Sequence, residues 1–192
     1  MTELPAKNVS AEDELLILVD AADNESGQMS KAECHDGSGV LHRAFSVFLF
    51  NDRGEILLQQ RSADKRLWPM YWSNSCCSHP RKGESIGLAT SRRLQEELNV
   101  VARLEYVYKF TYQASFGALG SENELCSVFL GRIEEEASAN ATEIEALRYV
   151  TVDALRDELV AQPDLFTPWL KLELQRLTGE FAETLAMFST PR

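Results

Sequence analysis

The chain has three histidines, and two of them, His35 and His42, lie seven residues apart around Gly37 and Gly39. A loop with two glycines can fold back sharply, so both imidazoles could reach one point. The third, His79, lies in a segment rich in cysteine and serine. A lone histidine is more often a structural residue, but imidazole is also the commonest metal ligand. Three of them together indicate a site for a divalent ion.

Glu122 and Glu124 stand two positions apart at the start of an expected strand, so their side chains point to the same face. Two like charges on one face repel each other unless water or a metal ion lies between them. Alone, the pair would be interpreted as a solvated strand end. Beside three histidines, it completes a shell of five ligands. Such a shell leaves one octahedral position for substrate, or for a second oxygen of a ligand already present.

Cys77 lies two residues before His79, in a segment that also contains Asn74, Ser75 and Ser78. Most free cysteines are small buried apolar residues, and that alternative stays open here. A thiol with a pKa near ~8.5 is nevertheless usable as an acid and as a nucleophile. The polar neighbours favour a role in acid–base chemistry.

An expected helix over 85–98 carries the pairs Arg92/Glu96 and Arg93/Glu97. Surface pairs at this spacing contribute only a few tenths of a kcal/mol, and Arg before Glu is the weaker order. Stability is therefore a poor reason for them, whereas an arginine and a carboxylate on one helix face can hold a diphosphate and its magnesium. Basic residues that flank the cysteine segment could complete the anion site, although each alone would be an ordinary surface charge: Lys31, Arg61 and Lys65.

The elements that position these residues are predicted from periodicity and turn residues. Residues 51–54 (NDRG) predict a hairpin, residues 20–27 a turn-rich loop, and residues 62–83 a long functional loop. The expected strands are 14–20, 43–50, 55–61, 102–112, 124–133 and 147–152. The expected helices are 85–98, 153–161, 166–178 and 180–188. The fold class is therefore mixed α/β (α+β), with a helical C-terminal part.

The composition limits the classes of molecule that this chain can bind. A chain of 192 residues with a net charge of −11 suits one domain that repels nucleic acid and anionic membranes, so an anionic substrate needs local cations or a metal. The sequence has no membrane-spanning run and no secretory signal, which favours the cytoplasm. Four cysteines, two of them adjacent, predict reduced thiols rather than disulfides. We expect a flexible segment over 1–13 and one catalytic domain over 14–192.

With these residues in view, the chain resembles the type I isopentenyl-diphosphate isomerases, which have a Nudix fold, from about Glu14 to Trp169. Residues 74–80 (NSCCSHP) are similar to the cysteine loop of that family, and residues 122–126 (ENELC) to its E-x-E element. Residues 166–169 (FTPW) are similar to its C-terminal tryptophan motif, and the two N-terminal histidines keep its seven-residue spacing. The resemblance implies a mixed sheet flanked by helices. It also implies interconversion of isopentenyl and dimethylallyl diphosphate through a tertiary carbocation, in isoprenoid biosynthesis.

The resemblance also implies roles for individual residues. Cys77 and Glu124 would be the two proton carriers, with Tyr112 assisting protonation near Glu124. Glu97 would hold a magnesium ion that bridges the diphosphate, and Trp169 would close over the hydrocarbon. One divalent ion, manganese or magnesium with zinc as a further option, would be bound by His35, His42, His79, Glu122 and Glu124. The diphosphate contacts would be Lys31, Arg61, Lys65, Ser78 and Arg93. The expected partner is a small isoprenoid diphosphate, and the expected state is a monomer.

The chain departs from the Nudix box, G-x5-E-x7-R-E-U-x-E-E-x-G-U. When Glu96 and Glu97 are aligned with its E-E pair, Ser78 and Asn99 replace its two glycines and Arg93 replaces a glutamate. The loss of that carboxylate argues against the alternative function, a Nudix-type diphosphate hydrolase. A second alternative is a zinc module, but the cysteines lack C-x-x-C pairs. It would use histidines with Cys34, Cys76, Cys77 or Cys126.

Overall fold

The computed structural model describes residues 9–192, so the prediction of a flexible segment over 1–13 lies largely outside the described residues. The described end of that segment packs against the domain. Val9 is buried and its carbonyl accepts a hydrogen bond from Arg93, while Ser10 accepts one from Lys31 at 2.7 Å. The domain limits 14–192 stay a prediction.

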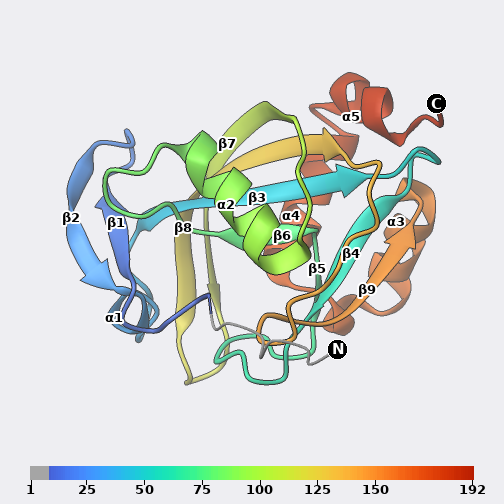
Figure 1. Ribbon diagram of the computed structural model, residues 1–192. Helices are drawn as coiled ribbons and strands as arrows, with labels where there is room; N and C mark the ends of the chain where they lie inside the picture. The colour runs from blue at the N-terminus through green and yellow to red at the C-terminus, as the bar shows by residue number, and fades with distance from the viewer. Residues whose placement is uncertain (1–8) are drawn as a thin grey trace, which may run out of the picture.

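A single sheet forms the centre of the described chain (Figure 1). Strand β3 occupies its middle and pairs with β1, β4, β6 and β8, while β8 also pairs with β7, and β4 with β9. The β3–β8 pair is parallel, and β7–β8 is antiparallel. The strands are β1 (Leu15–Val19), β2 (Glu25–Ser30), β3 (His42–Phe50), β4 (Ile56–Arg61), β5 (Trp72–Ser73), β6 (Cys76–Ser78), β7 (Leu104–Ser115), β8 (Ser121–Arg132) and β9 (Ile144–Val150).

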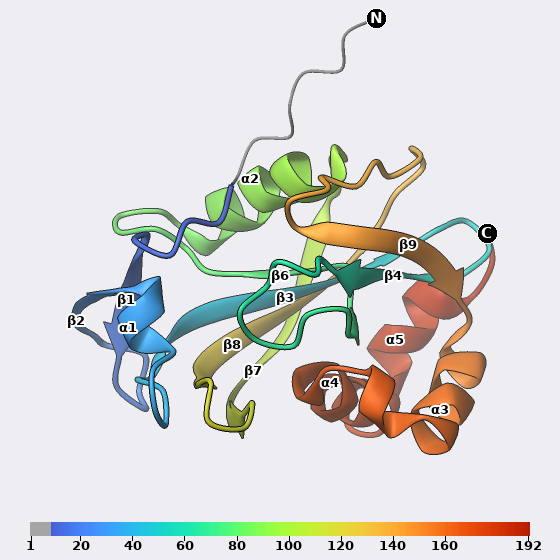
Figure 2. The same cartoon turned by 90° about the horizontal axis from the view of Figure 1, so that it is seen from below.

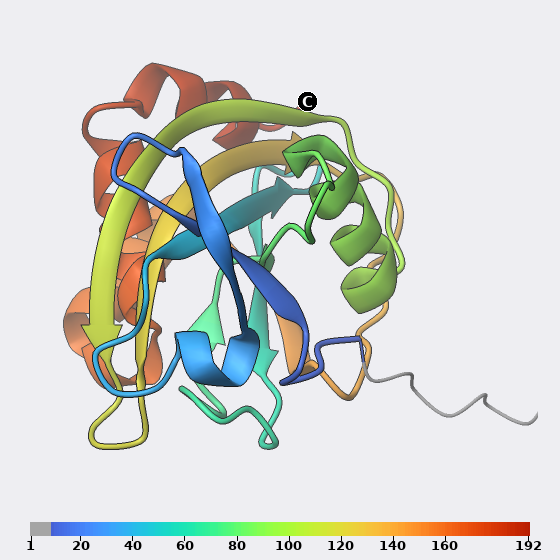
Figure 3. The ribbon, with the colours of Figure 1, turned by 90° about the vertical axis from the view of Figure 1, so that its left-hand side faces the viewer.

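Helices cover both faces of the sheet. Seen from below, α2 lies on one face and α3, α4 and α5 lie on the other (Figure 2). Strands β7 and β8 curve strongly, with α2 on the inner side of the curve and the C-terminal helices on its outer side (Figure 3). The helices are α1 (Lys31–Cys34), α2 (Ile86–Leu98), α3 (Val152–Ala161), α4 (Pro168–Thr178) and α5 (Ala182–Ser189), with a 3₁₀ turn at Pro163–Leu165. This confirms the predicted mixed fold, and no helix within residues 9–192 is long and apolar enough to cross a membrane.

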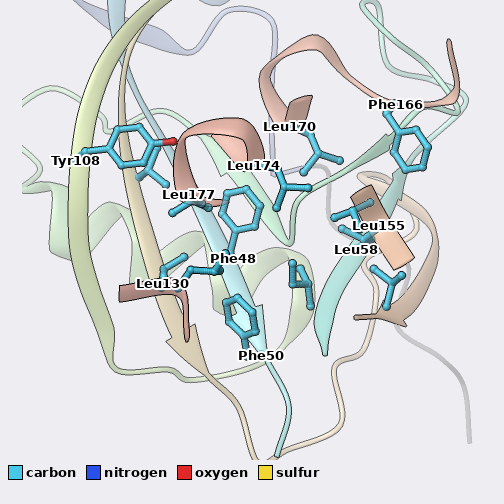
Figure 4. Packing of buried hydrophobic residues seen from close by; sticks show 14 residues of the cluster. Phe48, Phe50, Leu58, Tyr108, Leu130, Leu155, Phe166, Leu170, Leu174 and Leu177 are labelled. Carbon is cyan, nitrogen blue, oxygen red and sulfur yellow. The ribbon is translucent and has the colours of Figure 1, made fainter. Parts of the chain in front are cut away.

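The central strand β3 is buried on both faces, and its side chains alternate between two cores. Phe45, Val47 and Leu49 pack in the core beneath α2, whereas Phe48 and Phe50 point to the opposite face. There they meet leucines of β8 and α4, as Figure 4 shows. Each such side chain contributes roughly 1.5–3 kcal/mol on burial. The two cores thus fix β3, and with it every residue that β3 presents.

Several predicted elements differ from those observed. The loop predicted over 20–27 ends early, because β2 begins at Glu25 and pairs with β1 although its sequence, ESGQMS, has little apolar alternation. The loop predicted over 62–83 contains β5 and β6, which are too short to show a period. The strand predicted from residue 124 begins at Ser121, so Glu122 lies inside it. The 51–54 hairpin forms only at its turn, where Phe50 faces Ile56.

Candidate active site

Five side chains that are far apart in the sequence converge at one end of the sheet. His35 follows α1, His42 begins β3, His79 follows β6, and Glu122 and Glu124 lie on β8. One nitrogen or oxygen atom of each lies within 4.8 Å of all the others. The imidazole ring centroids are 4.9–5.7 Å apart. The predicted cluster of three histidines and two glutamates is therefore confirmed as a group.

Two glycines allow this convergence. Gly39, in the loop between the first two histidines, has a φ of 76°, and a Cβ there would lie 2.9 Å from the carbonyl oxygen of Ser121. Gly120 has a φ of 149°, and a Cβ there would lie 2.3 Å from the carbonyl oxygen of His35. That same oxygen accepts a hydrogen bond from the Ser121 amide at 2.9 Å. The loop can therefore lie directly on the start of β8.

The hydrogen bonds of the cluster fit a bound metal ion. Nδ1 of His35 lies 2.6 Å from the carbonyl oxygen of Lys31, and Nδ1 of His42 lies 2.8 Å from that of Val40. Donation to these carbonyls leaves each Nε2 with its lone pair toward the cluster. Nε2 of His42 is buried and has no hydrogen-bond partner, which is an unfavourable state for a polar atom. A divalent ion would supply the missing contact.

Charge and burial prepare the ligands for a cation. Burial lowers the pKa of His79 to about 4, so its imidazole is neutral. Burial acts to raise the pKa of Glu124, but the hydrogen bond with His79 and the nearby imidazole of His42 outweigh it and hold that pKa well below its usual range. Attraction to His35, whose Nε2 lies 2.8 Å from Oε2 of Glu122, likewise outweighs burial and lowers the pKa of Glu122. Ionised carboxylates and neutral imidazoles are the forms that bind metal.

Strand register brings Tyr112 to the cluster. Glu124 lies opposite Tyr112 in the β7–β8 pair and opposite His42 in the β3–β8 pair. The Tyr112 hydroxyl donates to Oε2 of Glu124 at 2.7 Å. Burial raises the pKa of Tyr112 well above its ordinary value, so the phenol keeps its proton. The tyrosine can therefore hand a proton toward this carboxylate or orient it.

Cys77 lies on β6 and faces polar groups rather than a purely apolar core. Its Sγ donates to Oδ1 of Asn74 at 2.8 Å, and it lies 3.5 Å from Oγ of Ser46 and 3.8 Å from Oγ of Ser73. Burial raises the pKa of the Cys77 thiol far above its usual value, so the resting group carries a proton. These contacts disfavour the alternative of an inert apolar cysteine.

Cys77, Tyr112 and Glu124 all line one cavity of about 300 Å³, and Trp169 lies in its wall. The Trp169 indole donates to Oγ of Ser73 at 2.8 Å, which fixes the plane of the ring. Most of the metal ligands and the cysteine thus share one cavity with an aromatic surface.

The predicted diphosphate contacts line the same cavity. Glu143 joins two of them, because one of its carboxylate oxygens accepts from Lys65 and lies 3.3 Å from Nη2 of Arg93. The guanidinium of Arg61 donates to the carbonyls of Leu67 and Trp68. The cavity-lining members of the predicted set are Lys31, Arg61, Lys65, Ser78 and Arg93.

Glu97, like the fully buried His42, is a predicted site residue that does not line the cavity. Its side chain is buried behind Arg93, and its Oε1 lies 2.6 Å from Nη2 of that arginine. The neighbouring pair Arg92/Glu96, with N and O 3.0 Å apart, shares its arginine with Glu84. In the structure, these charged side chains therefore form ion pairs, and a magnesium role for Glu97 stays a prediction.

Several polar residues of the site were missed from the sequence. Glu143 lies in a segment without a distinctive pattern, and Ser46 lies in an otherwise apolar strand. Glu173 had a usable signal, because it occupies an inward position between Leu170 and Leu174 on an apolar helix face. A charged residue at such a position is rarely buried without a reason.

The zinc-module alternative finds no support among residues 9–192. The group able to hold a metal contains nitrogen and oxygen donors and no sulfur. The cysteines are free thiols, as predicted, and all but Cys77 are fully buried: Cys34, Cys76 and Cys126.

Comparisons with known proteins agree with this geometry. The NUDIX domain family matches residues 40–170. A relative from Photorhabdus laumondii, named isopentenyl-diphosphate Delta-isomerase 1, is 40% identical over 162 residues, which cover 83% of this chain and 92% of the relative. The isopentenyl-diphosphate Delta-isomerase of Serratia proteamaculans is 43% identical and covers 82% of this chain and 87% of the relative.

Solved structures share the fold at lower identity. A Deinococcus radiodurans protein superposes with a TM-score of 0.71 at 23% identity, covering 85% of this chain and 98% of the other. The MutT protein of Methanosarcina mazei Go1 gives a TM-score of 0.61 at 15% identity, covering 73% and 94%. These likenesses concern the fold alone. From the sequence relatives and the domain match, the chain belongs to the isopentenyl-diphosphate Delta-isomerase family within the Nudix fold.

Proposed function

We propose that this protein interconverts isopentenyl diphosphate and dimethylallyl diphosphate. The observation that carries the proposal is a single cavity in which a protonated thiol, Cys77, and a tyrosine–carboxylate pair, Tyr112 and Glu124, are both available to a ligand. The relatives named above are called isopentenyl-diphosphate Delta-isomerases, and this chain matches most of their length. Moving a double bond needs one group to give a proton and another to take one, and the cavity holds both.

The proton balance requires no co-reactant. In one direction, a carrier loses its proton to the terminal methylene carbon of isopentenyl diphosphate, and the π electrons form the new C–H bond. The tertiary carbocation then loses a proton from the neighbouring methylene to the second carrier, and that C–H pair becomes the new double bond. We assign the two carriers as Cys77 on β6 and Glu124 on β8, with Tyr112 passing or orienting the proton at Glu124.

The cluster of five ligands is assigned as the site of one divalent ion, magnesium or manganese, with zinc as the further option. When bound, the ion would fix the orientation of Glu124 and tune its proton affinity. Oxygen and imidazole donors suit all three ions. A second ion, magnesium bridging the diphosphate at Glu97, would require Arg93 to release that carboxylate.

The carbocation needs a dry and electron-rich surrounding. Trp169 offers a π surface on the cavity wall, which is worth roughly 2 kcal/mol for a desolvated cation. The indole hydrogen bond to Ser73 holds this ring in place. Closure of the cavity around a bound substrate would also exclude water, which would otherwise add to the cation.

The diphosphate is assigned to the basic side of the cavity. On a chain of net charge −11, an anion is attracted only by a local concentration of cations. Lys31, Lys65 and Arg93 provide it, and Arg61 and Ser78 add donors. A cytoplasmic location and a monomeric state remain expectations from the sequence.

An isomerisation assay with isopentenyl diphosphate, with and without a divalent metal, tests the proposal. We expect turnover that depends on metal, and Cys77→Ala should nearly abolish it while substrate still binds. Cys76→Ala is the matched control, because the adjacent thiol packs beneath α2 on the opposite face of the sheet. Wild-type turnover in Cys77→Ala would contradict the assignment. Release of inorganic phosphate instead of isomerisation would favour a hydrolase.

A further inference from the structure

A buried carboxylate, Glu173, lies beneath the cavity and has no part in the chemistry above. It belongs to α4, one turn after Trp169, and is fully buried. Its Oε1 accepts a hydrogen bond from Sγ of Cys126 at 3.7 Å, whereas Oε2 has no partner. Within residues 9–192 no cation forms a salt bridge with it. An ionised carboxylate in this place would be strongly disfavoured.

Ser46 connects this carboxyl group to Cys77. Strand register places Ser46 opposite Cys77 in the β3–β6 pair, with Oγ and Sγ 3.5 Å apart. The Ser46 hydroxyl also faces the carboxyl of Glu173 and lies 3.5 Å from Sγ of Cys126. One hydroxyl group thus lies beside the proposed proton carrier and beside Cys126, the thiol that contacts the buried acid.

Burial raises the pKa of Glu173 to about 8. The hydrogen bonds from Ser46 and Cys126 act in the opposite direction, and the charge of Glu124 adds to the rise. A metal ion at Glu124 would reduce that smaller contribution but would not change burial. The titratable groups that face Glu173 are Cys77 from β6, Cys126 and Glu124 from β8 and Tyr108 from β7, none of them a cation. Figure 4 shows the Tyr108 hydroxyl beside α4, where it donates to the Glu173 carbonyl.

A neutral carboxyl group sets the direction of this hydrogen-bond chain. Its O–H must donate, and the acceptors that face it are the Ser46 oxygen and the Cys126 sulfur. Donation to Ser46 leaves the single Ser46 proton free to donate to Cys77. The thiol proton of Cys77 is already directed to Asn74, at 2.8 Å, so it does not compete with the Ser46 proton.

We propose that Glu173 is a positioning residue that, as a neutral acid, directs the Ser46 hydroxyl toward Cys77, and that its ionisation reverses this hydroxyl. The inference rests on the proposed role of Cys77 as a proton carrier. When Cys77 has given its proton away, Ser46 donates to the thiolate. When Glu173 loses its proton, Ser46 donates to the new carboxylate instead. The thiolate then loses a donor and gains a negative neighbour, both of which oppose its formation.

Ionisation of Glu173 should change kcat rather than KM, because the diphosphate side of the cavity is formed by other residues. For the metal-loaded wild type, we expect kcat to fall at least about tenfold as Glu173 ionises, between about pH 7 and pH 9. Glu173→Gln is neutral at every pH and can still donate through its amide, so this alkaline decline should disappear. Ser46→Ala should lower kcat and also remove the decline. An unchanged alkaline decline in Glu173→Gln would overturn the proposal.

A measurement without substrate separates this proposal from the proposed function. Infrared difference spectra of the metal-loaded wild type, titrated with base, should show the carbonyl band of a protonated carboxyl group that is lost near pH 8 and is absent from Glu173→Gln. Loss of that band in the acidic range would overturn the role of Glu173 even if isomerisation is found. Absence of isomerisation with the band present would instead overturn the proposed function, and with it the link to Cys77.

Discussion

The pH dependence of stability offers a test of Glu173 that needs no enzyme assay. An ordinary glutamate has a pKa of 4.5, whereas burial raises that of Glu173 to about 8. Between these values the unfolded chain releases a proton that the folded protein retains. The contribution of this group to the free energy of unfolding is therefore fully present below about pH 4.5 and is lost as the pH rises toward 8.

Each pH unit in this window corresponds to about 1.4 kcal/mol for one group. From about pH 5 to pH 8, the wild type should lose about 3 kcal/mol of stability relative to Glu173→Gln, which cannot ionise. Other titrating groups are common to both proteins, so they cancel in this difference. A constant offset from the buried amide of glutamine cancels as well.

Urea unfolding of the metal-loaded proteins at several pH values gives the two curves. Glu183→Gln on α5 is the matched control, because that glutamate is exposed at the surface. We expect the difference between wild type and Glu173→Gln to grow with pH and that for Glu183→Gln to stay nearly flat. Parallel curves for wild type and Glu173→Gln would show that Glu173 is already ionised at acidic pH, and the reasoning would fail.

Three further predictions concern the site itself. His42→Ala should lower the metal-to-protein ratio found by elemental analysis, because Nε2 of His42 is buried without a partner and faces the cluster; an unchanged ratio would count against the ligand set. Tyr112→Phe removes the hydroxyl 2.7 Å from Glu124 and should reduce kcat by about 10²-fold with little change in KM, and a pure KM effect would refute its proton role. Glu143→Gln should tighten pyrophosphate binding several-fold in calorimetry, because Lys65 and Arg93 lose a competing carboxylate; weaker binding would mean that Glu143 positions them instead.

The sequence alone was sufficient for features that short-range chemistry determines. The two glycines between His35 and His42 predicted that these side chains could meet, because only a sharp loop lets them do so. The spacing of Glu122 and Glu124 predicted a shared face, since side chains alternate along a strand. The helix over 85–98 was equally readable, because its apolar positions recur with helical spacing and Ser85 caps its first turn.

The other features of the site depend on pairing between segments that are far apart in the sequence. The parallel register of β3 with β8 places His42 beside Glu124, and nothing local in either segment encodes a match across so much chain. The same applies to Glu143, which joins Lys65 to Arg93 across distant parts of the chain. The Arg93–Glu97 pair, by contrast, is local, because the two residues are one helical turn apart. Glu173 lies between the two cases, because its inward position on an apolar helix face can be predicted from the sequence, whereas its proton affinity cannot. Burial raises the pKa of its carboxyl group. Burial depends on the packing of the whole protein, so it cannot be deduced from the residue type alone.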